Sequence, residues 1–181
     1  TNGTGPYYNR VTIRAQGAHR AGSIMHTTEP DNGVFTGTRG PNANLYIVER
    51  CGQFAKKHRT YLAAPIVLRE GASVYNSVLL FDRTGGLVGR YDKQHLTGPE
   101  LASGLVPGGG GVPVFETDRG RIGFQICYDI EWDDGWQELR RKGAEIVFWP
   151  SAFPGGKKVS AKAWQHQFAV VSSTCKGPSR L

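Results

Sequence analysis

Residues 121–129 read Arg-Ile-Gly-Phe-Gln-Ile-Cys-Tyr-Asp. The run from Ile122 to Tyr128 is mostly apolar and predicts a buried strand that ends near Cys127. Asp129 and Glu131 follow directly, so the chain turns polar where the predicted strand stops. Reactive groups at such strand ends face the cleft of an α/β sheet. This stretch therefore predicts a thiol at a strand end in an α/β protein.

Strands and helices alternate on both sides of this stretch. Apolar and β-branched runs predict strands at 24–28, 61–67, 74–81, 87–91, 112–115, 146–149 and 168–172. Helical spacing is clearest at 43–58 and at 135–142, where Asp133 or Asp134 caps the helix, and weaker at 9–21 and 164–167. A turn at Asp82–Gly86 joins two of the strands as a hairpin, and Pro150 ends another. The pattern indicates the α/β class with a mixed sheet or sheets.

The bulk composition is that of an ordinary globular protein. A domain of 181 residues buries roughly 70% of its unfolded surface and needs no disulfide or metal for support. Hydrophobic residues make up 39% of the chain and charged residues 20%. The 25 glycines are clustered and not periodic, so they indicate tight turns and not a fibre. We therefore predict a single domain over residues 1–181.

The charge pattern excludes some classes of partner. The net charge is +7, but Lys and Arg are scattered along the chain apart from short pairs such as Lys56-Lys57. Nucleic-acid readers usually gather basic residues on one helix or stripe, so we expect a solvated basic surface and no nucleic-acid partner. No run of about 18 apolar residues exists, so we expect no membrane partner. The three cysteines cannot all pair and match no metal motif, which favours a reducing, cytoplasmic location.

A lone cysteine is most often a small core residue, so Cys127 needs supporting groups before it counts as reactive. A thiol near its free pKa of about 8.5 is only a few per cent thiolate at pH 7 and requires a base or a cation nearby. Lys93 and Glu100 lie on the loop after a predicted strand, and Glu29 ends another. His95 is an alternative base, in a Cys–His pair. A solvated lysine, a structural histidine and a turn-capping glutamate remain open for these residues. The residues alone support a thiol hydrolase or transferase.

Four segments together resemble the nitrilase superfamily of carbon–nitrogen hydrolases. They stand in the order and spacing of that family, and they are residues 21–29, residues 75–77 followed by 85–96, residues 121–129, and residues 143–152. The resemblance implies a four-layer α-β-β-α sandwich. It also implies a catalytic triad of Glu29 as general base, Lys93 as the lysine and Cys127 as nucleophile. Glu100 is similar to a second glutamate of the family and is expected to position the substrate or water. No metal or organic cofactor is implied.

The residues around Cys127 also bear on the substrate. Family members that act on nitriles usually carry Trp directly after the nucleophile, whereas this chain has Tyr128. The resemblance therefore implies a small amide or N-carbamoyl substrate, cleaved through a cysteine thioester with release of ammonia or an amine. A nitrilase and a non-catalytic scaffold of the same fold are the alternatives. The backbone N–H of Tyr128 is expected to help Lys93 hold the oxyanion. Trp132, Trp149 and Phe153 are expected either to line the acyl pocket or to lie in the core.

The resemblance covers residues from about 21 to about 173. The family's first apolar strand and its C-terminal part are not recognisable in these 181 residues, so we expect an incomplete domain that does not fold alone as an active enzyme. Missing strands leave apolar sheet faces and edges exposed. The expected partners are a small-molecule amide and further copies of the chain in a homo-oligomer. Cys51 and Cys175 are expected to be structural or incidental.

Overall fold

The computed structural model describes residues 9–14, 21–26 and 43–174, with the backbone alone given for the first two ranges and for 43–46. The chain divides into two compact units, Thr1–Val88 and Gly89–Leu181.

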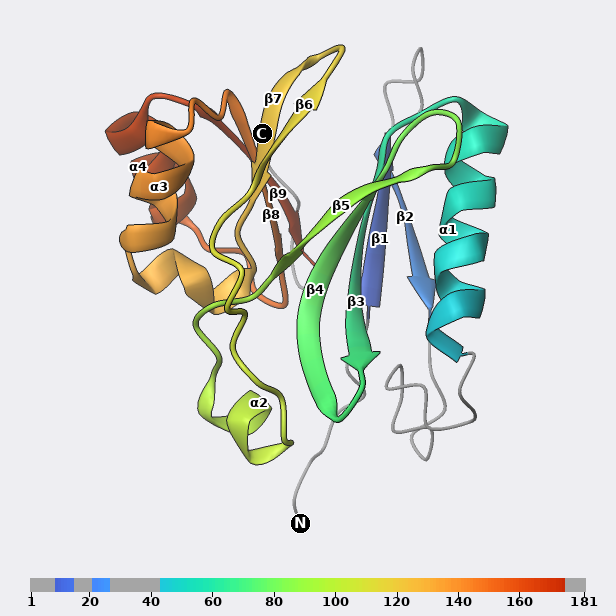
Figure 1. Cartoon of the computed structure of the whole chain (residues 1–181). Helices are drawn as coiled ribbons and strands as arrows, with labels where there is room; N and C mark the ends of the chain where they lie inside the picture. Colours follow the sequence, from blue (N-terminus) through green and yellow to red (C-terminus); the bar gives the residue numbers. More distant parts are fainter. Residues whose placement is uncertain (1–8, 15–20, 27–42, 175–181) are drawn as a thin grey trace. The chain divides into compact units, whose positions relative to one another are not determined.

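The first unit is built on an antiparallel sheet (Figure 1). Five strands form a sheet in the order β2-β1-β3-β4-β5, and the last of them, β5, begins in this unit and continues from Gly89 as the start of the second unit. Their bounds are β1 (Asn9–Arg14), β2 (Ala21–His26), β3 (Leu62–Glu70), β4 (Ser73–Phe81) and β5 (Leu87–Asp92). β3 and β4 pair antiparallel along their whole length, from Leu62 opposite Phe81 to Glu70 opposite Ser73.

Helix α1 (Ala43–His58) covers one face of this sheet (Figure 1). Its apolar positions recur at helical spacing, and Cys51 and Ala55 are buried among sheet residues. The sheet side of this core comprises Leu62, Ala64, Ile66, Leu79 and Phe81. Burial raises the pKa of the Cys51 thiol to about 11, so this cysteine stays a neutral core residue at pH 7.

The turn between β4 and β5 explains why the chain reverses at Asp82. The Asp82 carboxylate accepts hydrogen bonds from the backbone N–H groups of Thr84 and Gly86, at 2.7 and 3.0 Å. Gly85 has φ +91°, a left-handed conformation that glycine adopts without steric cost. The predicted hairpin turn at residues 82–86 is therefore confirmed.

The second unit has a mixed sheet with helices on one face (Figure 1). The strand order is β6-β7-β8-β9, where β6 (Val114–Thr117) and β7 (Gly120–Phe124) form a hairpin. β8 (Ile146–Ser151) and β9 (Ala169–Thr174) continue the sheet in parallel. Parallel strands require crossover connections, and α3 (Asp134–Arg141) and α4 (Lys157–His166) supply them.

Helix α3 packs closely on β7. A Cβ atom at Gly123 would lie 2.3 Å from a methyl carbon of Leu139, which is fully buried. Trp136, one turn earlier on the helix, is also fully buried and lies with its ring 6.1 Å from that of Phe168. The helix therefore turns one apolar side to the sheet, as its predicted periodicity requires.

The first predicted helix is wrong. Residues 9–14 form strand β1, which pairs antiparallel with β2 so that Val11 lies opposite Ile24. The sequence from Val11 to Ile13 is β-branched, and such residues favour strands over helices. The weak helical spacing that we read over 9–21 is therefore outweighed by these local preferences. Residues 15–20 lie outside the described part.

Three smaller differences concern element boundaries. A short helix, α2 (Gly98–Ala102), lies in the stretch 96–111 that we predicted as loop. Helix α4 begins at Lys157 and not near Trp164. Strand β8 continues through Pro150 to Ser151. β8 pairs with β7 only as far as Phe148. Beyond that residue no backbone N–H is required on the β7 side, so Pro150 is tolerated in the strand.

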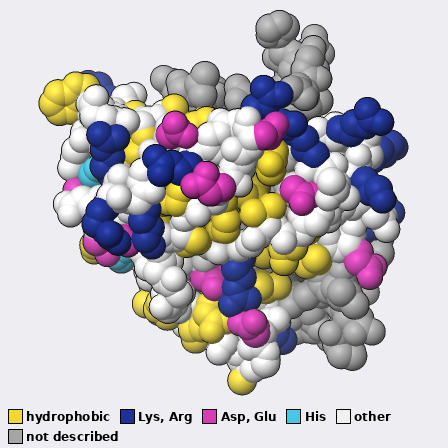
Figure 2. Space-filling view, turned by 45° about the horizontal axis from the view of Figure 1, so that its top comes forward, with side chains coloured by type: hydrophobic (Ala, Val, Ile, Leu, Met, Phe, Trp, Pro, Cys, Tyr) yellow, Lys and Arg dark blue, Asp and Glu magenta, His cyan; other side chains and the backbone are white. Residues whose placement is uncertain are grey.

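The predicted mixed α/β class is confirmed, with each unit made of a sheet and one layer of helix. How the layers of the two units stack stays a prediction. Figure 2 shows Lys and Arg interspersed with Asp and Glu on the visible face, in agreement with the expected solvated basic surface. Among the described helices, none is long and apolar enough to cross a membrane.

Candidate active site

Cys127 lies just beyond the end of β7, in the second unit. It opens a short 3₁₀ turn, η3 (Cys127–Glu131), and is half-buried. Its φ is +46°, in the left-handed region that non-glycine residues seldom occupy. Such a conformation costs on the order of 1–3 kcal/mol and persists where the surroundings hold it. The predicted strand thus stops three residues earlier than expected, and the cysteine sits on a sharp turn.

Three hydrogen bonds hold this turn in place. The backbone N–H of Ile126 donates to the Asp129 carboxylate at 2.9 Å, directly before the cysteine. The indole N–H of Trp149, on β8, donates to the carbonyl oxygen of Cys127 at 2.9 Å. The indole N–H of Trp136, on α3, donates to the Asp129 carbonyl oxygen at 3.1 Å. The turn is therefore held by a side chain of the turn itself, by the neighbouring strand and by the covering helix.

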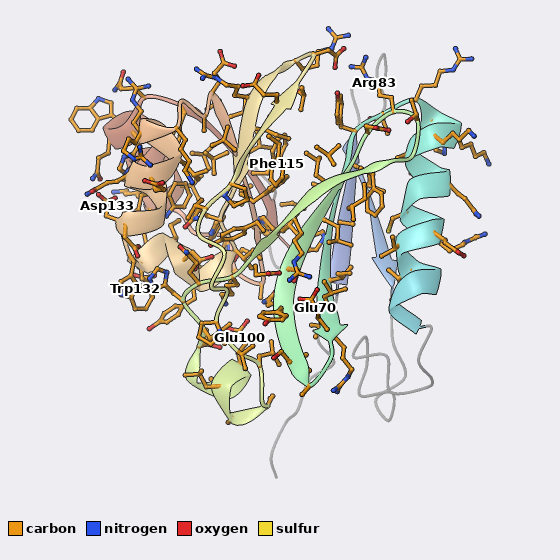
Figure 3. All side chains as sticks on the ribbon, in the orientation of Figure 1. Glu70, Arg83, Glu100, Phe115, Trp132 and Asp133 are labelled. Atoms are coloured by element: carbon orange, nitrogen blue, oxygen red, sulfur yellow. The ribbon has the colours of Figure 1, made fainter. Side chains whose placement is uncertain are left out.

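Lys93 is buried and paired with a carboxylate. Only 1% of its side chain is exposed, and its Nζ lies 2.6 Å from Oε2 of Glu100. Glu100 is on α2 (Figure 3), where Oε2 also accepts from the backbone N–H and the hydroxyl of Thr97, at 2.7 and 2.8 Å. A buried ammonium is stable only with such partners. The structure therefore brings together two of the residues that the sequence singled out, Lys93 and Glu100.

Asp129 links the lysine loop to the cysteine turn. Its buried carboxylate accepts the backbone N–H of His95 at 2.9 Å as well as that of Ile126. Burial raises the pKa of Asp129, and its hydrogen bonds together with the charge of Lys93 act in the opposite direction. From the sequence, Asp129 was distinguished only by its polarity after the predicted strand. Its place two residues after Cys127 is the signal that could have drawn attention to it.

His95 is not placed as an alternative base. Its Nδ1 lies 3.1 Å from Asp129 and its Nε2 lies 3.3 Å from Asp134, so both ring nitrogens face carboxylates. Both ring nitrogens are therefore engaged by carboxylates in the described contacts, and neither contact is with a thiol. The ring also stacks on Trp132, with centroids 4.5 Å apart and an interplanar angle of 5°. This arrangement supports the structural role for His95 and disfavours the Cys–His alternative.

The aromatic residues after the cysteine fall into two groups. Tyr128 and Trp132 meet edge to face with centroids 4.6 Å apart, and Trp132 (Figure 3) is 39% exposed. Trp149 is fully buried and meets Phe153 edge to face, and its indole N–H donates a hydrogen bond to the cysteine turn. That position suits support of the turn. Contact of Tyr128, Trp132 or Phe153 with a substrate stays a prediction, as does such contact of Trp149.

Glu29, the expected general base, lies outside the described residues, as do residues 27–42 around it. The candidate site therefore consists of Cys127 on its turn, the buried pair of Lys93 and Glu100, and the carboxylate of Asp129 that ties their segments together.

A sequence model of the carbon-nitrogen hydrolases matches residues 26–172. The chain belongs to the carbon–nitrogen hydrolase family. The predicted resemblance is thereby confirmed, and the match extends over both compact units of this family member.

Three curated relatives show the range of proteins that this chain resembles. A deaminated glutathione amidase from Dictyostelium discoideum is 29% identical over 74% of this chain and 48% of the relative. A beta-ureidopropionase from Arabidopsis thaliana is 32% identical, over 62% of this chain and 28% of the relative. A bifunctional nitrilase/nitrile hydratase from Lupinus angustifolius is 32% identical, over 58% of this chain and 30% of the relative. The chain thus spans less than half the length of each.

Among solved structures, an amidase from Nesterenkonia sp. is similar to this chain. The TM-score is 0.66 with 24% sequence identity, over 74% of this chain and 53% of that one. The likeness confirms the predicted nitrilase-like fold class. The partial coverage agrees with the expectation that segments of the family's domain are not among these residues.

Proposed function

We propose that the protein containing this chain hydrolyses a non-peptide C–N bond of a small amide or N-carbamoyl compound through a thioester on Cys127. The observation that carries the proposal is the held left-handed turn at Cys127, tied through Asp129 to the segment that bears a buried, carboxylate-paired lysine. Family membership supports the same chemistry. A structural cysteine needs neither the strained turn nor the lysine.

In the first half of the reaction, the Cys127 sulfur attacks the carbonyl carbon and Glu29 takes the thiol proton. The developing oxyanion is held by the ammonium of Lys93 and the backbone N–H of Tyr128. An ammonium has three N–H donors, and the contacts described for Lys93 use one of them, to Glu100. One preorganised oxyanion donor is worth about 3–4 kcal/mol in kcat.

In the second half, the tetrahedral intermediate collapses, the C–N bond breaks and Glu29 returns its proton to the departing amine. Water then attacks the thioester carbon, a glutamate takes a proton from it, and the free thiol and a carboxylic acid are released. Glu100 orients the substrate or this water while its Oε2 oxygen holds Lys93. The bonds from Thr97 support it in that task because they fix its position at the start of α2.

The substrate class rests on the residue that follows the nucleophile. Tyr128 stands where nitrile-acting members usually carry Trp, and two of the relatives named above are an amidase and a ureidopropionase. We therefore favour an amide or N-carbamoyl compound. The second candidate is a nitrile, since a relative with similar identity is a bifunctional nitrilase/nitrile hydratase.

We also propose that both units form a single hydrolase domain, because the family match runs through both. A cytoplasmic homo-oligomer is proposed as the working form. Cys51 and Cys127 are free thiols, which suits a reducing compartment. Size-exclusion chromatography with light scattering tests the oligomer, and a mass equal to one chain would contradict it.

The function is tested by ammonia release from a panel of small amides, N-carbamoyl compounds and matched nitriles, with the full-length protein. We expect turnover of an amide or N-carbamoyl compound that Cys127→Ala abolishes, whereas Cys51→Ala, which removes the other described thiol, retains it. Full turnover by Cys127→Ala would sink the proposal. Acid formed readily from a nitrile but not from its amide would reverse the choice of substrate.

A further inference from the structure

Asp129 accepts hydrogen bonds from three separate segments of the second unit. Its Oδ2 accepts from the Tyr91 hydroxyl at 2.8 Å and from the backbone N–H of Ile126 at 2.9 Å. Its Oδ1 accepts from the backbone N–H of His95 at 2.9 Å and from that residue's ring Nδ1 at 3.1 Å. The donors thus come from β5, from the loop after it and from the residue that precedes Cys127. The carboxylate itself is fully buried.

The two backbone donors are those nearest to the proposed chemistry. His95 is two residues after Lys93, and Ile126 is directly before Cys127. Because peptide units are planar and the chain has only two soft torsions per residue, fixing these amides strongly restricts the path of their neighbours. A single carboxylate therefore fixes the lysine segment relative to the cysteine turn.

A second layer holds the carboxylate. The Tyr91 hydroxyl gives its proton to Asp129, so its oxygen is left to accept, and the side-chain amide of Gln125 donates to it at 3.2 Å. Both Tyr91 and Gln125 are almost fully buried. The same amide nitrogen also donates to the carbonyl oxygen of Phe124 at 3.0 Å, and because a carbonyl can only accept, this bond sets the orientation of the amide. The bonds therefore run in one direction, from Gln125 through Tyr91 to Asp129.

An ionised carboxylate would be unfavourable at this buried position if the only role of residue 129 were to fill space in the core. Burial raises the pKa of Asp129, and burial together with the Asp129 charge raises the pKa of Tyr91 well above its ordinary value. Buried ionised groups often stabilise a fold less than apolar residues of the same size. A carboxylate here is explained if its oxygens must accept two backbone N–H groups and two side-chain groups at once, which no apolar residue does.

We propose that Asp129 is a positioning residue for catalysis, which sets the turn of Cys127 relative to Lys93 by binding the backbone of Ile126 and His95. This inference rests on the proposed function of Cys127 as nucleophile. Asp129 itself does not touch the reacting atoms. It acts through the backbone that carries the two residues that do.

The test replaces Asp129 by Asn in the full-length protein and follows the alkylation rate of Cys127 and the steady-state kinetics. Asparagine keeps the shape, but one oxygen becomes an NH2 group that cannot accept, so two of the four donors lose their acceptor. We expect iodoacetamide to alkylate Cys127 about 10-fold more slowly, read by mass spectrometry of the Cys127 peptide. We expect kcat to fall about 100-fold with KM changed less than about 3-fold, as for a misplacement of about 1 Å.

Two further variants separate positioning from mere stability. Asp133→Asn is the matched control, because Asp133 (Figure 3) also accepts several side-chain hydrogen bonds, from Gln137, Lys162 and Gln165, but joins α3 to α4. It is expected to lower thermal stability and leave Cys127 alkylation unchanged. Tyr91→Phe removes one bond to Asp129 and keeps both backbone bonds, so alkylation is expected to slow by about 3-fold, in line with the loss of one hydrogen bond.

The positioning role of Asp129 and the proposed function of Cys127 are contradicted by different results. If Asp129→Asn and Tyr91→Phe are alkylated at the wild-type rate, or if Asp133→Asn slows alkylation equally, the positioning role is wrong. Should Asp129→Asn fail to fold, the Cys127 alkylation rates of Tyr91→Phe and Asp133→Asn decide whether Asp129 has the positioning role. Turnover that survives in Cys127→Ala would instead overturn the proposed function, whatever the alkylation rates.

Discussion

At the scale of single residues, the molecule holds its proposed nucleophile in an uncommon conformation. Cys127 has φ +46°, and its carbonyl oxygen is bound by the indole of Trp149 on the next strand. Holding a residue in the left-handed region requires neighbours that favour it, and these bonds provide them. We infer that the reactivity of the thiol depends on the Trp149 side chain that holds its turn.

Trp149→Phe tests this dependence. The change keeps an aromatic ring in a fully buried site but removes the five-membered part of the indole, including the N–H that binds Cys127, so some loss of thermal stability from the smaller ring is expected as well. A lost hydrogen bond of about 1 kcal/mol, with the freed turn, is expected to lower kcat about 5- to 30-fold while the protein still folds. Steady-state kinetics and a thermal melt measure both effects. Trp164→Phe, at a site that is 79% exposed, is the control, and equal effects of the two substitutions would refute the role of Trp149.

The sequence was sufficient to single out Cys127, Lys93 and Glu100, because strand ends and the family motifs mark them. It did not reveal Asp129 as the shared acceptor or Trp149 as the support of the turn. Both depend on which side-chain atoms meet across β5, the cysteine turn and β8, and no periodicity encodes such contacts. Trp149 in particular reads as one more apolar residue of a buried strand, although its N–H is the group that matters.

At the scale of elements, close contacts between helices, strands and turns decide where small residues are required. Gly52 on α1 faces the turn between β4 and β5, and a Cβ atom there would lie 2.6 Å from the carbonyl oxygen of Gly85. A backbone oxygen cannot rotate away as a side chain can. The helix and the turn are therefore in contact because this position carries no side chain.

Gly52→Ala tests this contact, because the contact predicts a loss of stability whereas helix propensity alone predicts a gain. Alanine favours a helix over glycine by about 1 kcal/mol. The clash with the Gly85 oxygen costs about 1–3 kcal/mol, so we expect a net loss of about 1 kcal/mol in the free energy of unfolding. Urea denaturation measures it. Gln53→Ala, exposed on the same helix, should change stability by less than about 0.5 kcal/mol. Stabilisation by Gly52→Ala would show that α1 and the turn are not packed as described.

The junction of α3 and α4 is held by a carboxylate whose charge depends on pH. Burial acts to raise the pKa of Asp133, but hydrogen bonds from Lys162, Gln137 and His166 outweigh it and lower the pKa to about 2. A carboxyl whose folded-state pKa is lowered contributes stability at pH values above its unfolded pKa near 4. That contribution is lost as the pH falls from about 4 to about 2.

Asp133→Asn is therefore expected to reduce stability by about 1 kcal/mol at pH 6, a figure that allows for solvent screening of this half-exposed group. The difference between variant and wild type should shrink between pH 4 and pH 2. Urea unfolding at a series of pH values measures both trends. Glu116→Gln, at an exposed site on β6, serves as control. A difference that stays constant down to pH 2 would show that Asp133 does not carry this acid sensitivity.

Most elements could be predicted because their apolar spacing is strong. Helix α1 and the hairpin of β3 and β4 are examples. The failure at residues 9–14 has a local cause, since β-branched residues and the pairing of β1 with β2 and β3 outweigh a faint helical spacing. Helix α2 was missed because its short length and the proline at its start read as loop, and only the bonds between Thr97 and Glu100 reveal it.

At the scale of the whole molecule, the family match runs through both units, while the chain spans less than half of each curated relative named above. The fold class followed from the sequence because four motifs in order mark the family. The stacking of the two units did not follow from periodicity, which reports on single elements.

The most direct test of the central claim is to trap the acyl-enzyme. The full-length protein is mixed with an amide that it turns over, quenched in acid within the first turnovers, digested and measured by mass spectrometry. We predict that the peptide containing Cys127 gains the mass of the acyl group, and that the gain is absent from Cys127→Ala and retained in Cys51→Ala. An acyl group carried by another residue, or turnover by Cys127→Ala, would contradict the assignment of Cys127 as the nucleophile.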